Sequence, residues 1–387
     1  MTRISTVLHN LLWCVSCIPG WLRFRRALAN PKRSQIAILR RILRQNRDTE
    51  YGKCHGFETR DGWDDFRNLP VTTADDYADA IQRIRAGEKN ILTADPVRIL
   101  QPTSGSSSTP KLIPYTARMA EQFRAALDAW IGDLFLCHPK LLTGCQYWAI
   151  SPAGMPSHTE SGTVPVGFLD DAEYFGTGRC AIVKGAMAVP GEVRQVSGMA
   201  ANQYVTLLFL LRAKSLRLIS VWHPTFLTQL LKAMRRNWAR LVADIGVGGI
   251  RPDVDIIHDV RERLSCQLPP MPRRHRELLG HCPDDPELCR KVWPGLTVIS
   301  CWCDGNAERG VESIREAFPQ AVIQAKGLMA TEGVVTIPFR ENGAHTCAAT
   351  SHFFEFEDDR GDIRPLWELE AGKVYEVILT TAGGHYR

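Results

Sequence analysis

Short apolar runs alternate with longer stretches of helical periodicity along most of the 387-residue sequence. Five runs have the length and composition of buried strands and are bounded by polar or turn-forming residues. They cover residues 97–100, 147–151, 216–221, 296–302 and 322–324. Helical patterns cover residues 35–47, 202–214, 226–241 and 307–318. Strands that alternate with helices in this way predict an α/β fold in which sheets and helices are layered.

The C-terminal part of the sequence changes to short strand-like runs. They cover residues 353–356, 367–369 and 374–381. Residues 358–362 have the composition of a hairpin-type turn. We therefore expect three strands here, with this turn between the first and the second.

The first fifty residues are rich in arginine. Val7–Ile18 is apolar, but a run of about a dozen residues is short of the ~20 that span a bilayer. The arginines allow two interpretations, a helix on a membrane surface or a solvated helix face, and the second is the more common origin of such a pattern. We expect a helical segment over residues 1–95 that packs on an α/β core over residues 96–387, without insertion into a membrane.

Composition and charge indicate an ordinary globular protein, with 44% apolar and 23% charged residues. A net charge of +5 is too small to indicate a nucleic-acid partner. The twelve Cys are scattered, which predicts reduced thiols and a cytoplasmic location. Cys14 and Cys17 lack the βαβ context of a redox motif. The four later Cys lack the paired spacing of a zinc site; they are Cys282, Cys289, Cys301 and Cys303.

A hydroxyl-rich loop after the first apolar run is the strongest candidate for a binding site. It continues from Gln101 to Tyr115, and a helical pattern begins near Thr116. Backbone N–H groups and hydroxyls in such a loop can surround phosphate oxygens, and a glycine lets the backbone approach them. The candidate residues are Thr103, Ser104, Gly105, Ser106, Ser107 and Lys111. A polar surface loop is the alternative, since Ser, Thr, Pro and Gly clusters are usually loops.

The order of residues in this loop separates two kinds of phosphate site. It is not a Walker loop, because no second glycine precedes Lys111 and Leu112 stands where Ser or Thr would bind magnesium. It resembles the Thr-Ser-Gly-Thr-Thr-Gly-x-Pro-Lys signature of adenylate-forming enzymes. Ser108 stands where that signature has its second glycine, a position at which positive φ would strain a serine.

A second polar motif follows a predicted strand–helix–strand unit. Thr331 and Glu332 place a hydroxyl beside a carboxylate just beyond the strand at 322–324. Ligands of open α/β sheets bind at the carboxyl ends of strands. By itself the motif is more typical of a turn with a solvated glutamate, and the loop at Thr103 is what favours a site.

Further segments extend the resemblance over most of the chain. Asn46–Phe57, Leu69–Val71 and Ile81–Glu88 resemble the opening of the GH3 family, the acyl acid–amido synthetases of the adenylate-forming superfamily. The resemblance implies the large N-terminal domain of the adenylate-forming fold, with stacked β-sheets and helices. It also implies ATP and Mg²⁺ as cofactors.

Site roles follow from the same resemblance. It implies that Thr331 contacts phosphate, with Gly333 beside it, and that Glu332 holds Mg²⁺, which is sensible because Mg²⁺ is usually bound by one or two carboxylates and substrate phosphates. Asp304 and Gly305 lie in the segment that would border the adenine.

The last eight residues, from Thr380, resemble the third family motif, Thr-Thr-x-Gly-Gly-Leu-Tyr-Arg, with His385 in place of leucine. In relatives the motif is followed by a ribose-binding aspartate and a small C-terminal cap domain. The sequence stops at Arg387, so we expect both to be absent and amide formation by this chain alone to be slight.

The implied reaction has two steps. A substrate carboxylate attacks the α-phosphorus of ATP to form an acyl-adenylate, and an amine, an amino acid for example, then displaces AMP. Lys111 and Mg²⁺ would offset the charge that develops on the phosphates. Two alternatives stay open, an inactive nucleotide-binding remnant and an acyl-CoA ligase that shares the Thr-Ser-Gly loop.

Overall fold

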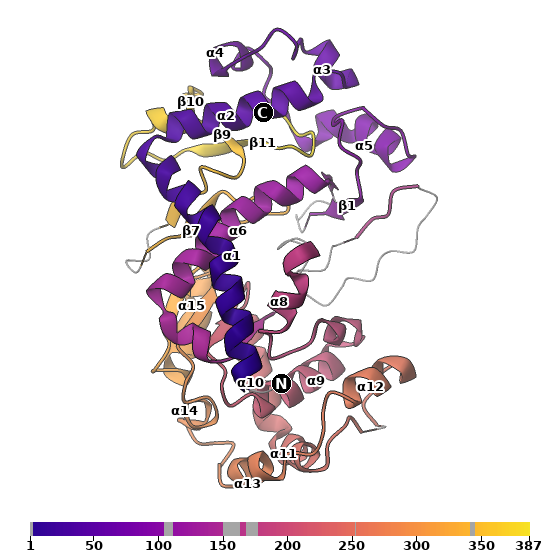
Figure 1. Cartoon of the computed structure of the whole chain (residues 1–387), viewed down its shortest axis with the longest axis vertical. Helices are drawn as coiled ribbons and strands as arrows, with labels where there is room; N and C mark the ends of the chain where they lie inside the picture. The colour runs from indigo at the N-terminus through magenta and orange to yellow at the C-terminus, as the bar shows by residue number, and fades with distance from the viewer. Residues whose placement is uncertain (1–2, 104–110, 150–162, 168–176, 252, 341–344) are drawn as a thin grey trace.

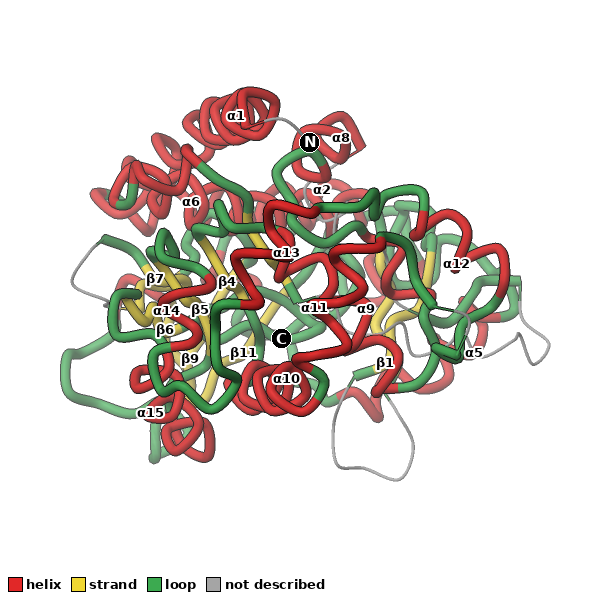
Figure 2. Tube along the Cα trace, turned by 90° about the horizontal axis from the view of Figure 1, so that it is seen from below, coloured by secondary structure: helices red, strands yellow, loops and turns green. Residues whose placement is uncertain are grey.

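Four parallel strands form the central sheet of this computed structural model (Figure 2). They lie in the order β3 (Gln146–Trp148), β4 (Leu218–Ser220), β5 (Val298–Cys301) and β6 (Val322–Ala325). The apolar runs of the sequence predicted all four. The structure describes residues 3–103, 111–149, 163–167, 177–251, 253–340 and 345–387.

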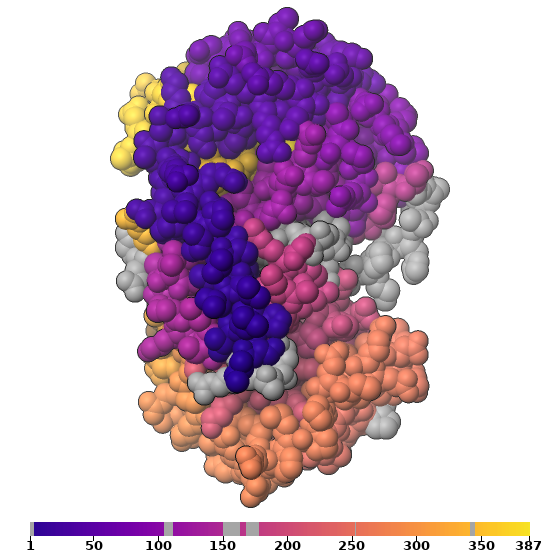
Figure 3. Space-filling view, viewed as in Figure 1, coloured from indigo at the N-terminus to yellow at the C-terminus, as the bar shows by residue number. Residues whose placement is uncertain are grey.

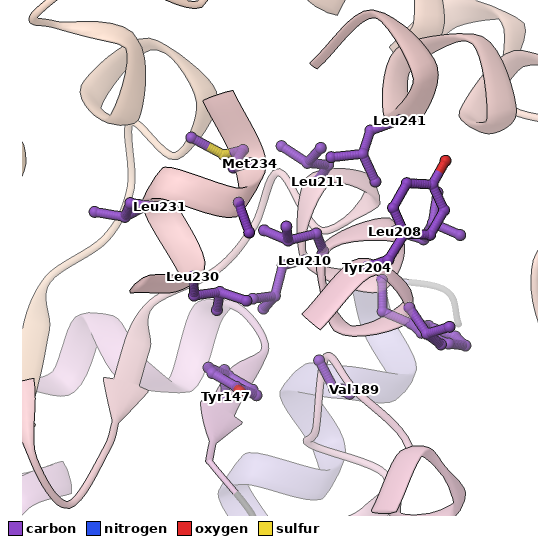
Figure 4. Packing of buried hydrophobic residues seen from close by; sticks show 14 of the residues in the cluster. Tyr147, Val189, Tyr204, Leu208, Leu210, Leu211, Leu230, Leu231, Met234 and Leu241 are labelled. Atoms are coloured by element: carbon purple, nitrogen blue, oxygen red, sulfur yellow. The ribbon is translucent and has the colours of Figure 1, made fainter. Parts of the chain in front are cut away.

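Helices that connect these strands cover the sheet and supply the largest core. They are α9 (Met199–Arg212), α10 (Pro224–Arg236), α11 (Trp238–Val247) and α15 (Glu308–Ala317). Leu208 and Leu210 of α9 belong to one buried cluster with Leu230 of α10 and Leu241 of α11 (Figure 4). Parallel strands require such crossover connections, and the strands between them are mostly apolar, although Gln146, Ser220 and Ser300 are buried polar residues.

One continuous helix was predicted over residues 226–241. This prediction was wrong, because the segment forms two helices. Asn237 interrupts it with φ −104° and ψ 12°. Its side-chain amide donates to the carbonyl of Ala233 at 2.9 Å. Asparagine competes in this way with the helical ladder for backbone groups.

Smaller helices complete the fold. They are α3 (Glu50–Cys54), α4 (Trp63–Phe66), α5 (Ala78–Arg85), α8 (Cys180–Lys184), α12 (His258–Ser265), α13 (Pro272–Leu279) and α14 (Leu288–Val292). The 3-10 helices among the described residues are η1 (Ala74–Tyr77), η2 (Pro139–Thr143), η3 (Thr177–Arg179), η4 (Gly191–Gln195), η5 (Gly305–Ala307) and η6 (Leu366–Glu368). Helices α11, α12 and α13 gather at the lower end of Figure 1.

Two long N-terminal helices cross the body of the protein (Figure 1). Helix α1 (Arg3–Ala29) packs along α6 (Ala117–Cys137), and α2 (Pro31–Asn46) packs on a C-terminal strand. The buried side chain of Gln35 donates to the carbonyls of Ala349 and His352, at 3.0 and 2.9 Å. Within the described residues, no helix is both long and apolar enough to cross a membrane. The domain boundary at residue 95 stays a prediction.

A three-stranded antiparallel sheet lies beneath α2. Its order is β10 (Ile363–Pro365), β9 (Phe353–Glu357) and β11 (Glu376–Thr380), and the predicted turn at 358–362 joins β9 to β10. The strand predicted at 367–369 was wrong, because η6 covers Leu366–Glu368. Pro365 cannot donate to a strand ladder, and the turn that follows it brings Trp367 against Trp63, with ring centroids 6.3 Å apart.

Candidate functional site

The hydroxyl-rich loop connects two antiparallel strands, β1 (Ile99–Pro102) and β2 (Leu112–Tyr115). The Thr103 N–H donates to the Lys111 carbonyl at 2.8 Å, which closes the base of the hairpin. Helix α6 begins at Ala117 as predicted, but the prediction that the loop runs directly into the helix was wrong. The remaining loop candidates lie outside the described residues; they are Ser104, Gly105, Ser106 and Ser107.

The second motif forms the tip of a tight turn. Ala330 and Gly333 exchange backbone hydrogen bonds of 2.9 and 3.2 Å, so that Thr331 and Glu332 occupy the two corner positions. Both corner side chains are partly exposed. The turn leads into the hairpin of β7 (Thr336–Pro338) and β8 (His345–Cys347).

Two charged side chains of the predicted site have no partner among the described residues. Over the described part of the chain, neither the Lys111 ammonium nor the Glu332 carboxylate has a hydrogen-bond or ion-pair partner, whereas acids such as Glu50 are paired with arginines. Charged side chains held at two turns without partners are available to a ligand.

Asp304 and Gly305 follow the carboxyl end of β5 by three and four residues. Both are exposed, and Gly305 has φ +57°, a backbone conformation that favours glycine. The Ala307 N–H donates to the Asp304 carbonyl at 3.2 Å, which starts the turn into α15. This turn therefore lies at the edge of the parallel sheet where open α/β folds bind ligands.

Packing brings the three motifs together. A side-chain carbon at Gly333 would lie 2.7 Å from Cδ2 of Leu379, the residue before the third motif. One at Gly383, inside that motif, would lie 2.6 Å from the Pro114 carbonyl oxygen of β2. Ile113 of β2 and Val334, which follows the second motif, also belong to one buried cluster. The third motif thus bridges the first and the second.

A buried imidazole underlies the second motif. His352 is fully buried, and its ring would lie 2.7 Å from a side-chain carbon at Gly333. The ring of Phe123 meets it edge-on at 5.5 Å. Burial lowers the pKa of His352 to about 3. The ring is therefore an uncharged support for the turn that carries Glu332.

The third motif holds the segment of α3 to α5 against the core. The Tyr386 ring stacks on Tyr51 at 4.7 Å, and its hydroxyl donates to the Leu92 carbonyl at 2.6 Å. His385 meets the Tyr77 ring edge-on at 5.0 Å. Burial lowers the pKa of His385 to about 4, so this imidazole stands in for the usual leucine as an uncharged ring.

A lysine that the sequence did not single out lies at the carboxyl edge of the parallel sheet. Lys326 follows β6 and is only 4% exposed. Its ammonium donates to the Ser220 hydroxyl at 2.7 Å. Three tryptophan rings surround it at 4.8 to 5.5 Å; they belong to Trp130, Trp148 and Trp222. Aromatic faces attract a desolvated cation in this way.

The sequence contained a weak indication of this cage, the three tryptophan rings around the Lys326 ammonium. Trp148 ends β3, Trp222 follows β4 by two residues, and Lys326 follows β6 directly. Carboxyl ends of parallel strands meet at one edge, so these side chains are expected at the same edge of the sheet, and the strand order decides which of them are neighbours. Trp130 carried no such signal, because it arrives from α6 and reaches Gln324 of β6 through a 3.0 Å hydrogen bond.

The residues present fit a metal that arrives with a nucleotide. No group of three or more His, Cys, Asp or Glu able to hold a metal occurs among the described residues. Glu332 offers a single carboxylate at a turn, and Mg²⁺ commonly takes one or two carboxylates together with substrate phosphates and water.

The comparisons with known proteins agree with this fold. The model of the GH3 family N-terminal domain matches residues 22–323, so the chain belongs to the GH3 family. It is 24% identical to indole-3-acetic acid-amido synthetase GH3.4 of Arabidopsis thaliana, over 92% of this chain and 63% of that protein. It is 22% identical to jasmonoyl--L-amino acid synthetase JAR6 of Nicotiana attenuata, over 91% and 64%. The chain therefore spans just under two thirds of these relatives.

Solved structures give the same result at the level of the fold. The chain superposes on the GH3.15 acyl acid amido synthetase with a TM-score of 0.77 at 20% identity, over 92% of this chain and 64% of that one. The same enzyme in complex with 2,4-DB gives a TM-score of 0.80. The predicted α/β fold, the large N-terminal domain of the adenylate-forming type, is confirmed.

Proposed function

We propose that this chain binds ATP and a small carboxylic acid and catalyses formation of an acyl-adenylate, which an amine then converts to an amide. The observation that carries the proposal is the packing of three separate motifs against one another through Gly333, Leu379, Gly383 and Pro114. Family membership supports it, since the named relatives are amido synthetases.

The proposed roles follow the chemistry of each motif. Backbone N–H groups and hydroxyls of the first loop surround the phosphates, and Lys111 offsets their charge. Glu332 holds Mg²⁺, which when bound neutralises phosphate charge and orients the leaving pyrophosphate. The proposed nucleotide contacts are Thr103, Ser104, Gly105, Ser106, Ser107, Asp304, Gly305, Thr331 and Gly333.

The reaction needs no protein nucleophile. A carboxylate oxygen of the acid forms a bond to the α-phosphorus, the bond from that phosphorus to the bridging oxygen breaks, and pyrophosphate leaves. An amine then attacks the acyl carbon and AMP leaves with the electron pair. In this scheme the protein contributes position and charge, the effects that dominate phosphoryl and acyl transfer.

A reducing compartment suits this chain. All twelve cysteines are free thiols. Burial raises the pKa of the Cys347 thiol to about 12 and of the Cys289 thiol to about 12, which keeps them protonated and unreactive. We propose a cytoplasmic location on this basis.

Pyrophosphate exchange tests the function as a whole. The 387-residue chain is incubated with ATP, Mg²⁺, labelled pyrophosphate and a panel of aryl and alkyl carboxylic acids. Acid-dependent exchange, followed by amide formation with amino acids, supports the proposal. Thioester formation with coenzyme A in place of the amine would identify an acyl-CoA ligase, and ATP binding without exchange a nucleotide-binding remnant.

Lys111→Ala is expected to weaken ATP binding by about tenfold, about 1.4 kcal/mol, because a charge-assisted contact to phosphate is lost. Isothermal titration with Mg²⁺–ATP measures the change. Lys232→Ala is the control, since Lys232 is an exposed lysine on α10. Equal affinities for wild type and Lys111→Ala would show that the first loop is only a surface hairpin.

Glu332→Gln keeps the shape of the turn and removes its charge. The Mg²⁺ concentration needed for half-maximal nucleotide binding is expected to rise by roughly tenfold, while binding of ATP without metal stays unchanged or improves. Glu316→Gln, at an exposed position of α15, serves as the control. An unaltered Mg²⁺ titration of the Glu332 variant would remove this residue from the metal site.

A further inference from the structure

The outer face of α1 is apolar over most of its length. From Ile4 to Leu22, every exposed side chain of this helix is apolar. They are Ile4, Val7, Leu8, Leu11, Leu12, Val15, Pro19 and Leu22. The exposed fractions are large, 83% for Ile4, 53% for Leu8 and 58% for Val15. A surface helix normally carries polar residues on this side, and a helix that is apolar all round is normally covered.

The inner face fixes α1 in this orientation. Asn10 is fully buried and donates to the carbonyls of Leu141, at 3.2 Å, and Gly144, at 2.7 Å. Farther along, the Trp21 indole donates to Asp133 of α6 at 3.0 Å. These polar contacts specify which side faces the body. Rotation of the helix to hide its leucines would break them, so the apolar face stays outward.

The C-terminal end of this apolar face is positively charged. The first 47 residues contain ten Lys and Arg and no Asp or Glu. The net charge of the remaining residues is therefore −5, although the net charge of the whole chain is +5. Arg25 and Arg26 stand eighteen residues, five helical turns, beyond Val7 and Leu8 and so continue the same stripe. Arg23, Arg25 and Arg26 are exposed, and among the described residues none of them has an ion-pair partner.

The shape of the region suits a flat partner. Helix α1 lies on the face of the molecule turned to the viewer in Figures 1 and 3, and in Figure 2 it stands at the periphery, outside α6. From Ile4 to Leu22 the stripe is about 27 Å long at 1.5 Å per residue. An outlying ridge with an apolar stripe and a basic end matches the boundary between anionic headgroups and acyl chains.

We infer that α1 docks this protein on the surface of an anionic lipid bilayer. The leucines and valines of the stripe enter the acyl boundary, and Arg23, Arg25 and Arg26 contact the headgroups. A second copy of the chain is a poorer occupant, because α1 and α2 offer no acidic residue to those arginines. The helix lies on the membrane in this arrangement and does not cross it.

Vesicle flotation with the 387-residue chain tests the inference. Binding to phosphatidylcholine vesicles with 30% phosphatidylglycerol is expected to exceed binding to pure phosphatidylcholine by at least tenfold, and to weaken as salt is raised. Leu8→Asp/Val15→Asp is expected to reduce binding at least tenfold. Val374→Asp is the matched control, because Val374 is 88% exposed at a site remote in sequence and outside α1.

Two measurements keep the outcomes separate. An unchanged urea midpoint for Leu8→Asp/Val15→Asp shows that lost binding does not come from unfolding. Sedimentation over a range of protein concentrations reports self-association. Three results would overturn the inference. They are absence of vesicle binding, vesicle binding that does not depend on lipid charge, and dimers that the Leu8 and Val15 substitutions abolish.

Discussion

Glu355→Gln is expected to lower the free energy of unfolding by about 3–5 kcal/mol, because it leaves a buried guanidinium without its counter-charge. Glu355 is fully buried and Arg387 has a side chain that is 3% exposed. Arg387 Nε and Glu355 Oε2 are 3.0 Å apart, and the Trp63 indole donates to the other carboxylate oxygen at 2.9 Å. Urea unfolding followed by circular dichroism measures the loss.

The reason for so large an effect is the number of groups that this pair organises. Arg387 also donates to the carbonyls of Arg67 and Leu69, and its own carbonyl accepts from Thr72. Burial raises the pKa of Glu355, although Arg387 opposes that shift. Removal of either charge leaves the other desolvated without compensation.

Two variants separate the charge from the shape. Glu357→Gln, on the same strand at a partly exposed position, is expected to change stability by no more than about 0.5 kcal/mol. Glu355→Gln/Arg387→Met removes both charges and is expected to be less destabilised than Glu355→Gln alone. Additive losses in the double variant would show that the two side chains act independently.

The central sheet was predictable because the apolar composition of each strand identifies it. Buried parallel strands are apolar on both faces, so Leu218–Ser220 and Val298–Cys301 stand out without knowledge of any partner. The hairpin strand Leu112–Tyr115 was missed for the opposite reason. It contains Pro114, which argues against a strand interior, and its ladder with Ile99–Pro102 depends on contacts that composition does not reveal.

The candidate site was only partly predictable. Short motifs indicated Lys111, Thr331 and Glu332, because local residue order carries the chemistry of a loop. The cage around Lys326 required knowledge of which strand lies beside which. The pair of Glu355 with Arg387 is non-local in the same sense, since it connects β9 to the third motif.

Acid is expected to destabilise the fold well above the titration range of most carboxylates. Burial lowers the pKa of His352 to about 3 and of His385 to about 4, from 6.5. Below pH 6.5 the unfolded chain therefore binds protons that the folded chain does not bind. Stability falls as pH decreases wherever the unfolded state holds more protons. Each imidazole is expected to cost about 2 kcal/mol by pH 5.

Urea midpoints at pH 7.5 and pH 5.0 measure this loss for wild type and for His352→Phe, which replaces the imidazole with a ring that cannot be protonated. The variant is expected to lose about 2 kcal/mol less than wild type between the two pH values, whatever its stability at pH 7.5. This difference isolates the imidazole from Glu355 and Asp128, whose raised pKa values act in the opposite direction. His258→Gln, on the exposed end of α12, serves as the control at the same two pH values. Equal losses in wild type and His352→Phe would mean that His352 is protonated, or reached by water, in the folded protein.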